Sequence, residues 1–469
     1  MQNIDNALLE LPAELVTRDQ DILSSYLTDF RRQYTGATPA LLRPRHTADV
    51  QTIIRVCAKH RIGIVPQGGN TSYCTAATPS ADGRELLISL EKMNRLRDLD
   101  KENLSVTADA GMILADLQRA ADEAGLLLPL ALGSQQSCRL GGNLSTNAGG
   151  INVVRYGMTR DLVLGLEAVL PDGSIYSELN PLRKNNSGYD VKQLFIGAEG
   201  TLGIITGVSL KLMRKPCQTI TAFLAVRDIS SLSAILNAAQ IQSGEAITSF
   251  EYISSASLNL LLTAKKHLRH PLPDESEHYV VLEAATVSPI LNLEECMNAL
   301  LAELLESGMM GDGTIAASQQ QRAALWYLRE SIPEAEVHHG GSVKHDIAVR
   351  TSRLSAFIES ASRLVKKHRD DAILSIYGHV GDGNVHFNIV PPIGTDQNAF
   401  KDRVEQEISP EIYQLAFEMG GTFSAEYGIG RVKLDLLRRY GAEGKTHVME
   451  RIKTAIDPRG ILNPGKVIP

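Results

Sequence analysis

One stretch of the chain reads Tyr377-Gly378-His379-Val380-Gly381-Asp382-Gly383-Asn384-Val385-His386-Phe387-Asn388, and apolar runs flank it on both sides. Asp382-Gly383 at its centre is typical of a two-residue β-hairpin turn, which needs positive φ at both central positions. With that turn, His379 pairs with His386, and Tyr377 pairs with Asn388. Side chains alternate along a strand, so all four lie on one face. The stretch therefore predicts a hairpin that carries two imidazoles on the same side.

This pair of histidines predicts a metal site. Directly opposed Cβ atoms lie about 4.5–5.5 Å apart, so both imidazoles could reach one ion. Two neutral imidazoles and one carboxylate are a common ligand set for a catalytic Zn²⁺ or a similar cation. The carboxylate must come from elsewhere, and Glu426 in the segment 421–430 is the candidate. An ordinary polar sheet face is the competing interpretation.

Length and composition describe a globular protein with more than one domain. The 469 residues exceed the roughly 250–300 that one core usually supports. Hydrophobic residues make up 43% and charged residues 22%, which is typical of soluble proteins. The net charge of −7 argues against nonspecific binding to nucleic acid or acidic membranes. An anionic substrate would therefore need a local basic pocket.

The cysteines and the N-terminus suggest a reducing compartment. The five cysteines are scattered without C-x-x-C spacing, and their number is odd. We therefore expect reduced, unpaired thiols in or near the core. The first ten residues lack the pattern of a signal peptide or an Arg-rich transit peptide. No apolar run approaches the roughly 20 residues that span a bilayer. The expected location is cytoplasmic.

Two Gly-rich segments occupy the first half of the chain. Residues 66–71 read Pro-Gln-Gly-Gly-Asn-Thr directly after a short predicted strand. Paired glycines there let consecutive N–H groups form a nest for phosphate oxygens, with a plain turn as the alternative. Residues 133–150 contain further glycine pairs, which would put bare backbone at a surface that a ligand approaches closely. A structureless loop is the alternative, and the apolar Leu140 and Leu144 argue against it. The chain has no G-x-G-x-x-G, so the Rossmann fingerprint is absent.

Taken together, these segments resemble FAD-linked dehydrogenases of D-2-hydroxyacids, in the vanillyl-alcohol-oxidase-like flavoproteins. The D-2-hydroxyglutarate and D-lactate dehydrogenase branch is the most similar. The resemblance covers almost the full length and rests on six segments: 66–71, 141–150, 186–203, 378–386, 426–430 and 463–466. It implies an α+β fold, with a two-subdomain FAD-binding domain over residues 1–215 and an α+β substrate or cap domain over 216–425. A C-terminal segment, 426–469, would return to complete the FAD site.

The resemblance also implies how FAD is held. Members with covalent flavin usually tether it through a histidine in the first loop, where this chain has Gln-Gly-Gly-Asn, so noncovalent FAD is expected. The first loop would cradle the pyrophosphate, 133–134 and 141–150 would line the flavin, and 203–205 would help hold the adenosine side. The implied cofactor-binding residues are Pro66, Gly68, Gly69, Asn70, Thr71, Gly133, Ser134, Gly141, Gly142, Asn143, Thr146, Asn147, Gly149, Gly150, Glu199, Gly203, Ile205 and Asn463.

The metal-dependent branch of the family implies a divalent cation, with Zn²⁺ the expected ion, on His379, His386 and Glu426. Its substrate residues match Asn388, Arg329 and Lys344, and the last two would hold the carboxylate of the substrate. Without the resemblance, Arg329 would be interpreted as part of a salt bridge on a helix surface, near Glu330 or Glu334.

Two positions depart from the family pattern. Tyr427 replaces the histidine usually given as general base, and a phenol with a pKa near 10 is a poor base at neutral pH. Pro333 replaces a threonine that contacts the distal carboxylate in the hydroxyglutarate branch. With Tyr427 included, the expected catalytic residues are Arg329, Lys344, Asn388 and Tyr427.

The expected activity is FAD-dependent, metal-assisted oxidation of D-2-hydroxyglutarate, with D-lactate and D-malate as alternative substrates. An electron-transfer flavoprotein or a quinone is the expected electron acceptor, and a homodimer is compatible with these expectations. Two other classes stay open. One is a metal-dependent hydrolase without flavin, and the other is a flavin-binding protein without catalysis.

Overall fold

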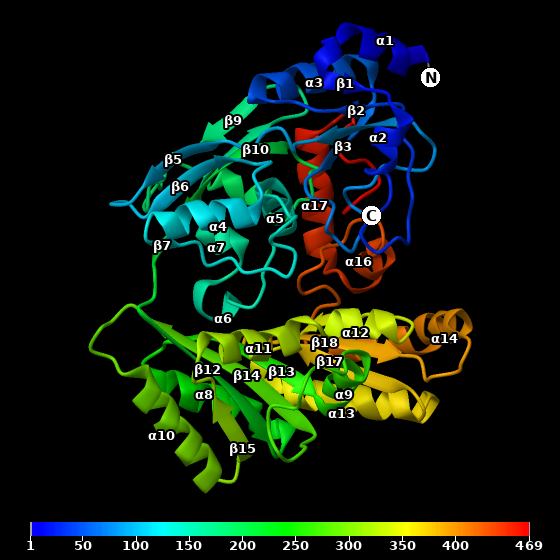
Figure 1. Cartoon of the computed structure of the whole chain (residues 1–469). Helices are drawn as coiled ribbons and strands as arrows, with labels where there is room; N and C mark the ends of the chain where they lie inside the picture. The colour runs from blue at the N-terminus through cyan, green and yellow to red at the C-terminus, as the bar shows by residue number, and fades with distance from the viewer. Residues whose placement is uncertain (1, 469) are drawn as a thin grey trace. The chain divides into compact units, whose positions relative to one another are not determined.

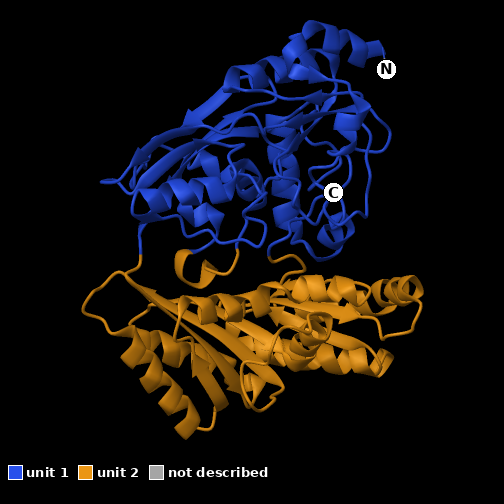
Figure 2. Cartoon of the chain, viewed as in Figure 1, with its two compact units in different colours: residues 1–149, 157–215, 426–469 blue, residues 150–156, 216–425 orange. Residues whose placement is uncertain are grey.

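The computed structural model describes residues 2–468, which form two compact units (Figures 1 and 2). Unit 1 comprises Met1–Gly149, Gly157–Lys215 and Glu426–Pro469, and unit 2 comprises Gly150–Tyr156 and Pro216–Ala425. The segment Gly150–Tyr156 was expected in the first domain and belongs instead with unit 2. The reason is helix α6 (Val153–Tyr156), whose Arg155 guanidinium donates to the carbonyls of Ala246 and Ala285.

Unit 1 contains a four-stranded sheet in the order β1-β2-β4-β3, a five-stranded sheet in the order β5-β6-β10-β8-β9, and the strand pair β11-β7. The strands are β1 (Val16–Thr17), β2 (Leu41–Leu42), β3 (Gly63–Gln67), β4 (Glu85–Ser89), β5 (Leu96–Asp100), β6 (Ser105–Asp109), β7 (Leu126–Leu127), β8 (Val163–Val169), β9 (Ile175–Glu178), β10 (Ile204–Lys211) and β11 (Met213–Arg214). The helices are α1 (Gln2–Glu10), η1 (Ala13–Leu15), α2 (Gln20–Ser24), α3 (Thr47–His60), α4 (Leu114–Glu123), α5 (Leu140–Thr146), α7 (Thr159–Leu162), η2 (Val191–Leu194), α16 (Leu434–Tyr440) and α17 (Glu443–Ile456).

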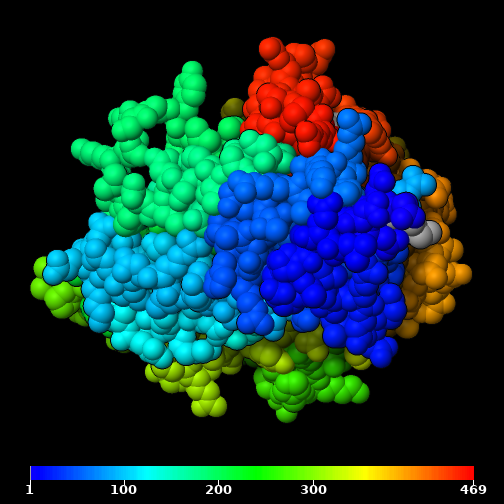
Figure 3. Space-filling model, turned by 90° about the horizontal axis from the view of Figure 1, so that it is seen from above, coloured from blue at the N-terminus to red at the C-terminus, as the bar shows by residue number. Residues whose placement is uncertain are grey.

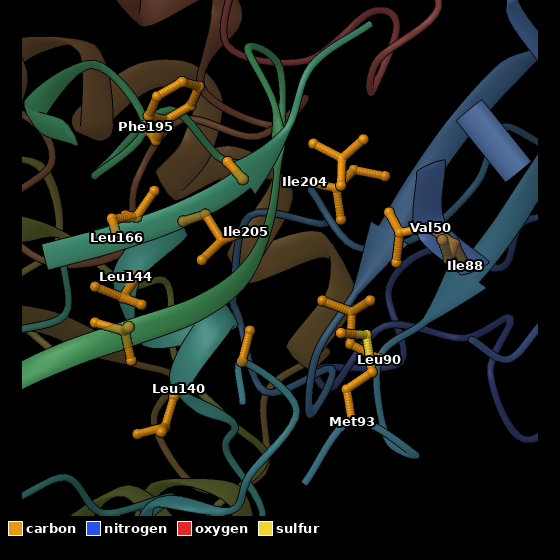
Figure 4. Packing of buried hydrophobic residues seen from close by; sticks show 14 of the residues in the cluster. Val50, Ile88, Leu90, Met93, Leu140, Leu144, Leu166, Phe195, Ile204 and Ile205 are labelled. Atoms are coloured by element: carbon orange, nitrogen blue, oxygen red, sulfur yellow. The ribbon is translucent and has the colours of Figure 1, made fainter. Parts of the chain in front are cut away.

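One cluster of buried apolar side chains joins the two larger sheets of unit 1 (Figure 4). Ile88 of β4 and Leu166 of β8 both belong to it. The end of the chain closes this core, because the Ile64 N–H donates to the Ile461 carbonyl at 2.7 Å and the Asn463 N–H donates to the Ile64 carbonyl at 2.8 Å. The segment between β9 and η2 is largely exposed, and it projects from the surface of unit 1 in Figure 3.

The centre of the Gly-rich segment 133–150 forms the helix α5, which the glycine pairs did not predict. Leu140 and Leu144 lie one turn apart, and both are buried in the core of unit 1. Burial of an apolar pair at this spacing favours a helix despite the poor helix propensity of glycine. Asn147 then ends the helix in the left-handed region, with φ of 50°.

Unit 2 is built on one antiparallel sheet in the order β15-β12-β14-β13-β17-β18-β16. Its strands are β12 (Gln218–Val226), β13 (Ile247–Ser254), β14 (His278–Thr286), β15 (Met310–Ile315), β16 (Asp346–Ala348), β17 (Ile373–Gly378) and β18 (Asn384–Val390). Besides α6, its helices are η3 (Ile229–Ser231), α8 (Leu232–Ser243), α9 (Ser255–Ala264), α10 (Leu293–Glu306), α11 (Gln319–Glu330), α12 (Ile332–His338), α13 (Thr351–His368), α14 (Gln397–Arg403), η4 (Val404–Ile408) and α15 (Ser409–Glu418).

The two faces of this sheet have separate cores. Alternate residues of β12 divide between them, with Leu224 in the cluster shared with α8, α10 and α13 and Phe223 in the cluster shared with α9, α11 and α12. This is the period of two expected of a strand buried on both sides.

The predicted hairpin is present as β17 and β18, but its predicted turn and register are wrong. Tyr377 pairs with His386, and residues 379–383 form a longer loop. Gly383 has φ of 88°, whereas Asp382 has no positive φ, so a two-residue turn of the expected type does not form. The Gly381 N–H donates to the Phe250 carbonyl on β13, and this bond draws the loop toward the neighbouring strand.

Two further features concern the chain as a whole. No helix among residues 2–468 is both long enough and apolar enough to cross a membrane. All five cysteines are free thiols, of which Cys57, Cys74 and Cys138 are buried. Cys217 is exposed, against the expectation of thiols in or near the core.

Candidate functional site

The structure brings His379, His386 and Glu426 together. One ligand atom from each lies within 4.8 Å of the others. His379 starts the loop after β17, His386 lies on β18, and their ring centroids are 5.6 Å apart at a steep angle. Both rings are almost completely buried, and Glu426 is partly exposed. Two imidazoles and one carboxylate can hold a divalent cation and leave a position open for substrate.

The backbone explains how Glu426 reaches the histidines from far along the sequence. Thr422 and Ala348 exchange backbone hydrogen bonds beside β16, and the Ala425 N–H donates to the Asp346 carbonyl at 3.3 Å. Asp346 is the residue that pairs with His386 across β16 and β18. The next residue after Ala425 is therefore held beside His386.

A buried carboxylate, Glu251 of β13, holds the other side of His379. It accepts hydrogen bonds from His379 Nδ1 at 2.6 Å and from Arg329 Nε at 2.8 Å. Burial disfavours the charged form of Glu251, but His379 and Arg329 outweigh it and hold the pKa of the carboxyl below its usual value. Because Nδ1 bonds to Glu251, Nε2 is the His379 nitrogen that a cation would use.

Arg329 is not on a helix surface, so the salt-bridge interpretation with Glu330 or Glu334 is wrong. The side chain points from α11 toward the sheet, and the residue is only 6% exposed. Its guanidinium carbon lies 4.8 Å from the ring centroid of Tyr377. Only Nε is engaged with Glu251, and the terminal nitrogens have no acceptor among residues 2–468.

A second buried carboxylate, Glu336 of α12, orders Lys344 and Asn388. It accepts from Lys344 Nζ at 2.7 Å, from Asn388 Nδ2 at 2.9 Å and from the Ser342 hydroxyl at 2.7 Å. Asn388 Nδ2 also donates to the Tyr377 hydroxyl at 3.2 Å. Since an ionised carboxylate only accepts, the amide of Asn388 must present its nitrogen to Glu336, which turns its oxygen away from that carboxylate.

Tyr427 follows Glu426 and is packed by residues of unit 1. Its ring centroid lies 4.6 Å from that of Tyr73, and the ammonium of Lys433 lies 5.5 Å from the Tyr427 ring centroid. Lys433 is itself almost completely buried.

The two Gly-rich segments of unit 1, residues 66–71 and 133–149, pack closely against each other. A Cβ on Gly69 would lie 2.2 Å from the Ser137 carbonyl oxygen, so only glycine fits there. A Cβ on Gly68 would lie 3.4 Å from the nitrogen of Gly142, whereas a Cβ on Gly142 would meet no atom within 4 Å. Two buried polar atoms, Asn143 Nδ2 in α5 and Asn463 Oδ1 near residue 469, have no hydrogen-bond partner among the described residues. Bare backbone, open space and unpartnered polar atoms fit a bound dinucleotide.

Comparison with known proteins identifies the family. Residues 38–177 match the FAD binding domain family, and residues 215–467 match the family described as FAD linked oxidases, C-terminal domain. A D-2-hydroxyglutarate dehydrogenase from Danio rerio is 37% identical over 98% of this chain and 84% of its own length. One from Stutzerimonas stutzeri is 33% identical over 97% of this chain and 96% of its own. The chain belongs to the FAD-linked D-2-hydroxyacid dehydrogenase family. It is a flavoprotein oxidoreductase that acts on CH–OH donors.

The fold of this dehydrogenase is also confirmed. The structure of p-cresol methylhydroxylase with bound substrate superimposes with a TM-score of 0.77 at 17% sequence identity, covering 99% of this chain and 97% of that one. The chain therefore has the expected α+β fold of the vanillyl-alcohol-oxidase type.

The expected cytoplasmic location is contradicted by the same comparison. The Danio rerio relative is named a mitochondrial enzyme, as are relatives from Oryza sativa and Bos taurus. The prediction rested on the unpaired cysteines and the first ten residues of the sequence, and the names of these relatives overturn it.

Not every predicted cofactor residue of the dehydrogenase offers its side chain to a ligand. The Glu199 carboxylate accepts from the N–H groups of Ile429 at 2.7 Å and Gly430 at 3.0 Å, so it holds the loop after Tyr427. Burial raises the pKa of this carboxyl to about 7, although both N–H groups oppose the shift. Ile205 is buried in the core of unit 1 together with Leu144 (Figure 4).

Three other predicted residues are also engaged within the protein. The Asn70 side chain donates to the Thr28 carbonyl at 2.8 Å, and a Cβ on Gly203 would press on the Phe195 ring. Gly150 falls in unit 2. The remaining predicted cofactor residues lie in unit 1 along β3 and the loop after it, before α5, in α5 or just beyond it: Pro66, Gly68, Gly69, Thr71, Gly133, Ser134, Gly141, Gly142, Asn143, Thr146, Asn147 and Gly149, with Asn463 near the end of the chain.

Sequence reasoning missed Glu251 and Glu336, and it gave no role to Tyr377, which it had placed on the same hairpin face as the histidines. All three are almost completely buried. For Glu251 a signal existed, because an isolated acid in the predicted strand 249–253 is unusual in a buried run and needs a partner. For Glu336 the sequence carries no comparable signal, because acids are common on helices.

Proposed function

We propose that this chain oxidises D-2-hydroxyglutarate to the 2-oxoacid, with FAD as the hydride acceptor and a divalent cation, Zn²⁺ being the expected ion, as the Lewis acid that polarises the hydroxyl group. The relatives carry this substrate in their names. The observation that carries the metal part of the proposal is the convergence of His379, His386 and Glu426 within 4.8 Å.

The side chains of unit 2 would bind and orient the substrate. Arg329 is anchored through Nε, which leaves its two terminal nitrogens to grip a carboxylate in the bidentate manner. Lys344 uses one N–H on Glu336 and keeps two donors for a second anionic oxygen. Both cations are paired with buried carboxylates, so they contribute orientation more than net positive charge.

Two further residues would act at the hydroxyl group of the substrate. Asn388 has both amide hydrogens engaged, so its carbonyl oxygen is the atom that can accept from a substrate O–H. Tyr427 would hydrogen-bond the developing alkoxide oxygen or take its proton, in place of the family histidine. The segment that follows Tyr427 is held by Glu199, whose carboxylate accepts hydrogen bonds from the N–H groups of Ile429 and Gly430.

Unit 1 would hold noncovalent FAD between the segment around Gly68–Gly69 and α5. The reduced flavin would then pass electrons to an electron-transfer flavoprotein or a quinone, as the family resemblance implies. The domain roles follow from this assignment, with residues 1–215 and 426–469 binding FAD and residues 216–425 binding substrate.

The test is anaerobic bleaching of the flavin absorbance by a panel of 2-hydroxyacids, with and without a chelator. We expect D-2-hydroxyglutarate to bleach the flavin fastest, with little reduction by the L-enantiomer. Chelation should slow bleaching at least about 100-fold, and Zn²⁺ should restore it.

The alternatives give different results in this experiment. Faster bleaching by D-lactate or D-malate would reassign the substrate within the family. A colourless purified protein would favour the metal-dependent hydrolase, and bound FAD that no 2-hydroxyacid bleaches would favour a flavin-binding protein without catalysis. Full activity after chelation would remove the metal from the proposal.

A further inference from the structure

Glu251 is the buried group that links two parts of the site. Its side chain is 1% exposed, and its two oxygens divide between His379 Nδ1 and Arg329 Nε. A buried carboxylate is costly unless its charge is paired and its lone pairs are used. Here the partners come from the loop after β17 and from α11, so one side chain fixes groups on two separate elements.

The bond to His379 decides which nitrogen of the imidazole faces the candidate cation site. A neutral imidazole has one N–H and one lone pair, and the carboxylate requires the N–H at Nδ1. The lone pair is then at Nε2. A carboxylate on the distal nitrogen also raises the basicity of a ligating imidazole and restrains rotation of its ring.

The bond to Arg329 decides how the guanidinium is presented. Engagement of Nε on Glu251 leaves the edge with both terminal nitrogens for a substrate carboxylate. Tyr377 covers the face of the same guanidinium at 4.8 Å. The position of Arg329 relative to His379 is therefore set by Glu251.

Two other buried carboxylates in unit 2 show what is specific to Glu251. Glu336 binds Lys344 and Asn388 but no histidine. Glu283 of β14 receives a bidentate pair from Arg322 at 2.7 and 2.8 Å and a bond from Trp326, and it also binds no histidine. Arg322 lies two turns before Arg329 on α11, so Glu283 forms the same kind of strand-to-helix ion pair outside the site.

We propose that Glu251 is a positioning residue that couples the cation-binding histidine to the substrate-binding arginine. The inference rests on the proposed function, because it takes His379 as a ligand of the cation. It predicts that loss of Glu251 weakens cation binding and substrate binding together, whereas loss of Glu336 weakens substrate binding alone.

The test measures Zn²⁺ affinity of the FAD-loaded protein by competition with a fluorescent chelator, together with KM and kcat. For Glu251→Gln we expect Zn²⁺ affinity to fall about 10–100-fold, the range for loss of a carboxylate behind a ligating histidine, and KM to rise. Glu283→Gln is the matched control and should change Zn²⁺ affinity less than two-fold. Glu336→Gln should raise KM and leave Zn²⁺ affinity within two-fold.

A second comparison covers the case in which Glu251→Gln misfolds because Arg329 is left buried without its partner. Arg329→Met alone keeps the contact between Glu251 and His379, whereas Glu251→Gln with Arg329→Met removes the ion pair as a unit. We expect the double variant to bind Zn²⁺ about 10–100-fold more weakly than Arg329→Met.

Equal Zn²⁺ affinity in these two variants would overturn the role of Glu251. An equal loss in Glu283→Gln would show a merely structural effect and would also overturn it. If the unchanged protein binds Zn²⁺ no better than His379→Ala does, the metal part of the proposed function fails as well.

Discussion

At the scale of single residues, Tyr427 stands where the family has a histidine, so its hydroxyl is the first group to test. We expect Tyr427→Phe to slow flavin reduction by at least about 100-fold, the usual contribution of a positioned acid–base group. FAD content and Zn²⁺ affinity should not change, because the ring is kept. The measurement is stopped-flow reduction across the pH range.

Tyr73→Phe is the control for this substitution. Its ring packs against Tyr427 at 4.6 Å, and the substitution preserves that packing. Reduction should stay within about two-fold of the unchanged protein. Full turnover by Tyr427→Phe at every pH would rule out an acid–base role for this hydroxyl.

Glu199 gives a prediction about pH. Burial raises its pKa to about 7 from 4.5, so between these values the folded protein keeps a proton that the unfolded chain releases. This contribution to stability is complete below pH 4.5 and is lost as the pH rises through 7. Between pH 5 and 6.5, we expect the unfolding free energy to fall about 1.4 kcal/mol per pH unit relative to Glu199→Gln. The prediction would be contradicted if the unfolding free energies of the two proteins, measured with urea, changed with pH in the same way across this range.

At the scale of elements, a substitution in α5 can test cofactor binding separately from folding. A Cβ on Gly142 meets no protein atom, so Gly142→Ala should fold normally and gain up to about 1 kcal/mol from helix propensity. The same Cβ would occupy space assigned to the flavin, so we expect FAD affinity to fall at least about ten-fold. Titration of the apoprotein with FAD measures this change.

Gly444→Ala on α17 is the matched control for Gly142→Ala. It is also a helical glycine of unit 1 with nothing within 4 Å of its Cβ position. This variant should gain similar stability without loss of FAD affinity. If both alanines bind FAD equally well, α5 does not line the flavin.

The elements also show what the sequence could and could not predict. The apolar runs that flank the stretch with His379 and His386 predicted two strands correctly, because that pattern is local. The register was wrong because Gly381 bonds to Phe250, a residue far away in the sequence. The same limit applies to Glu251 and Glu336, whose partners lie on other elements. The glycine pairs at 141–150 gave no sign of a helix, and the helix at 140–146 forms with Leu140 and Leu144 buried in the core.

At the scale of the whole molecule, each unit has its own apolar core. FAD is proposed to bind unit 1, and both histidines of the proposed cation site belong to unit 2. We therefore expect two thermal transitions in calorimetry of the apoprotein. FAD should raise the transition of unit 1, and Zn²⁺ should raise the transition of unit 2 more than that of unit 1, because unit 2 supplies both histidines and unit 1 supplies only Glu426. A ligand at 100 times its Kd should add about 2.7 kcal/mol to the unit that binds it. A single transition that both ligands raise equally would contradict this assignment.

The return of the C-terminus to β3 has a consequence for biosynthesis. The Ile64 N–H donates to Ile461 and the Ile64 carbonyl accepts from Asn463, so the first sheet lacks these partners until residues 461–463 have left the ribosome. Unit 2 is nearly complete in the nascent chain at Ala425, well before unit 1 is. Translation should therefore complete the proposed substrate unit before the flavin unit, which still needs residues 461–463.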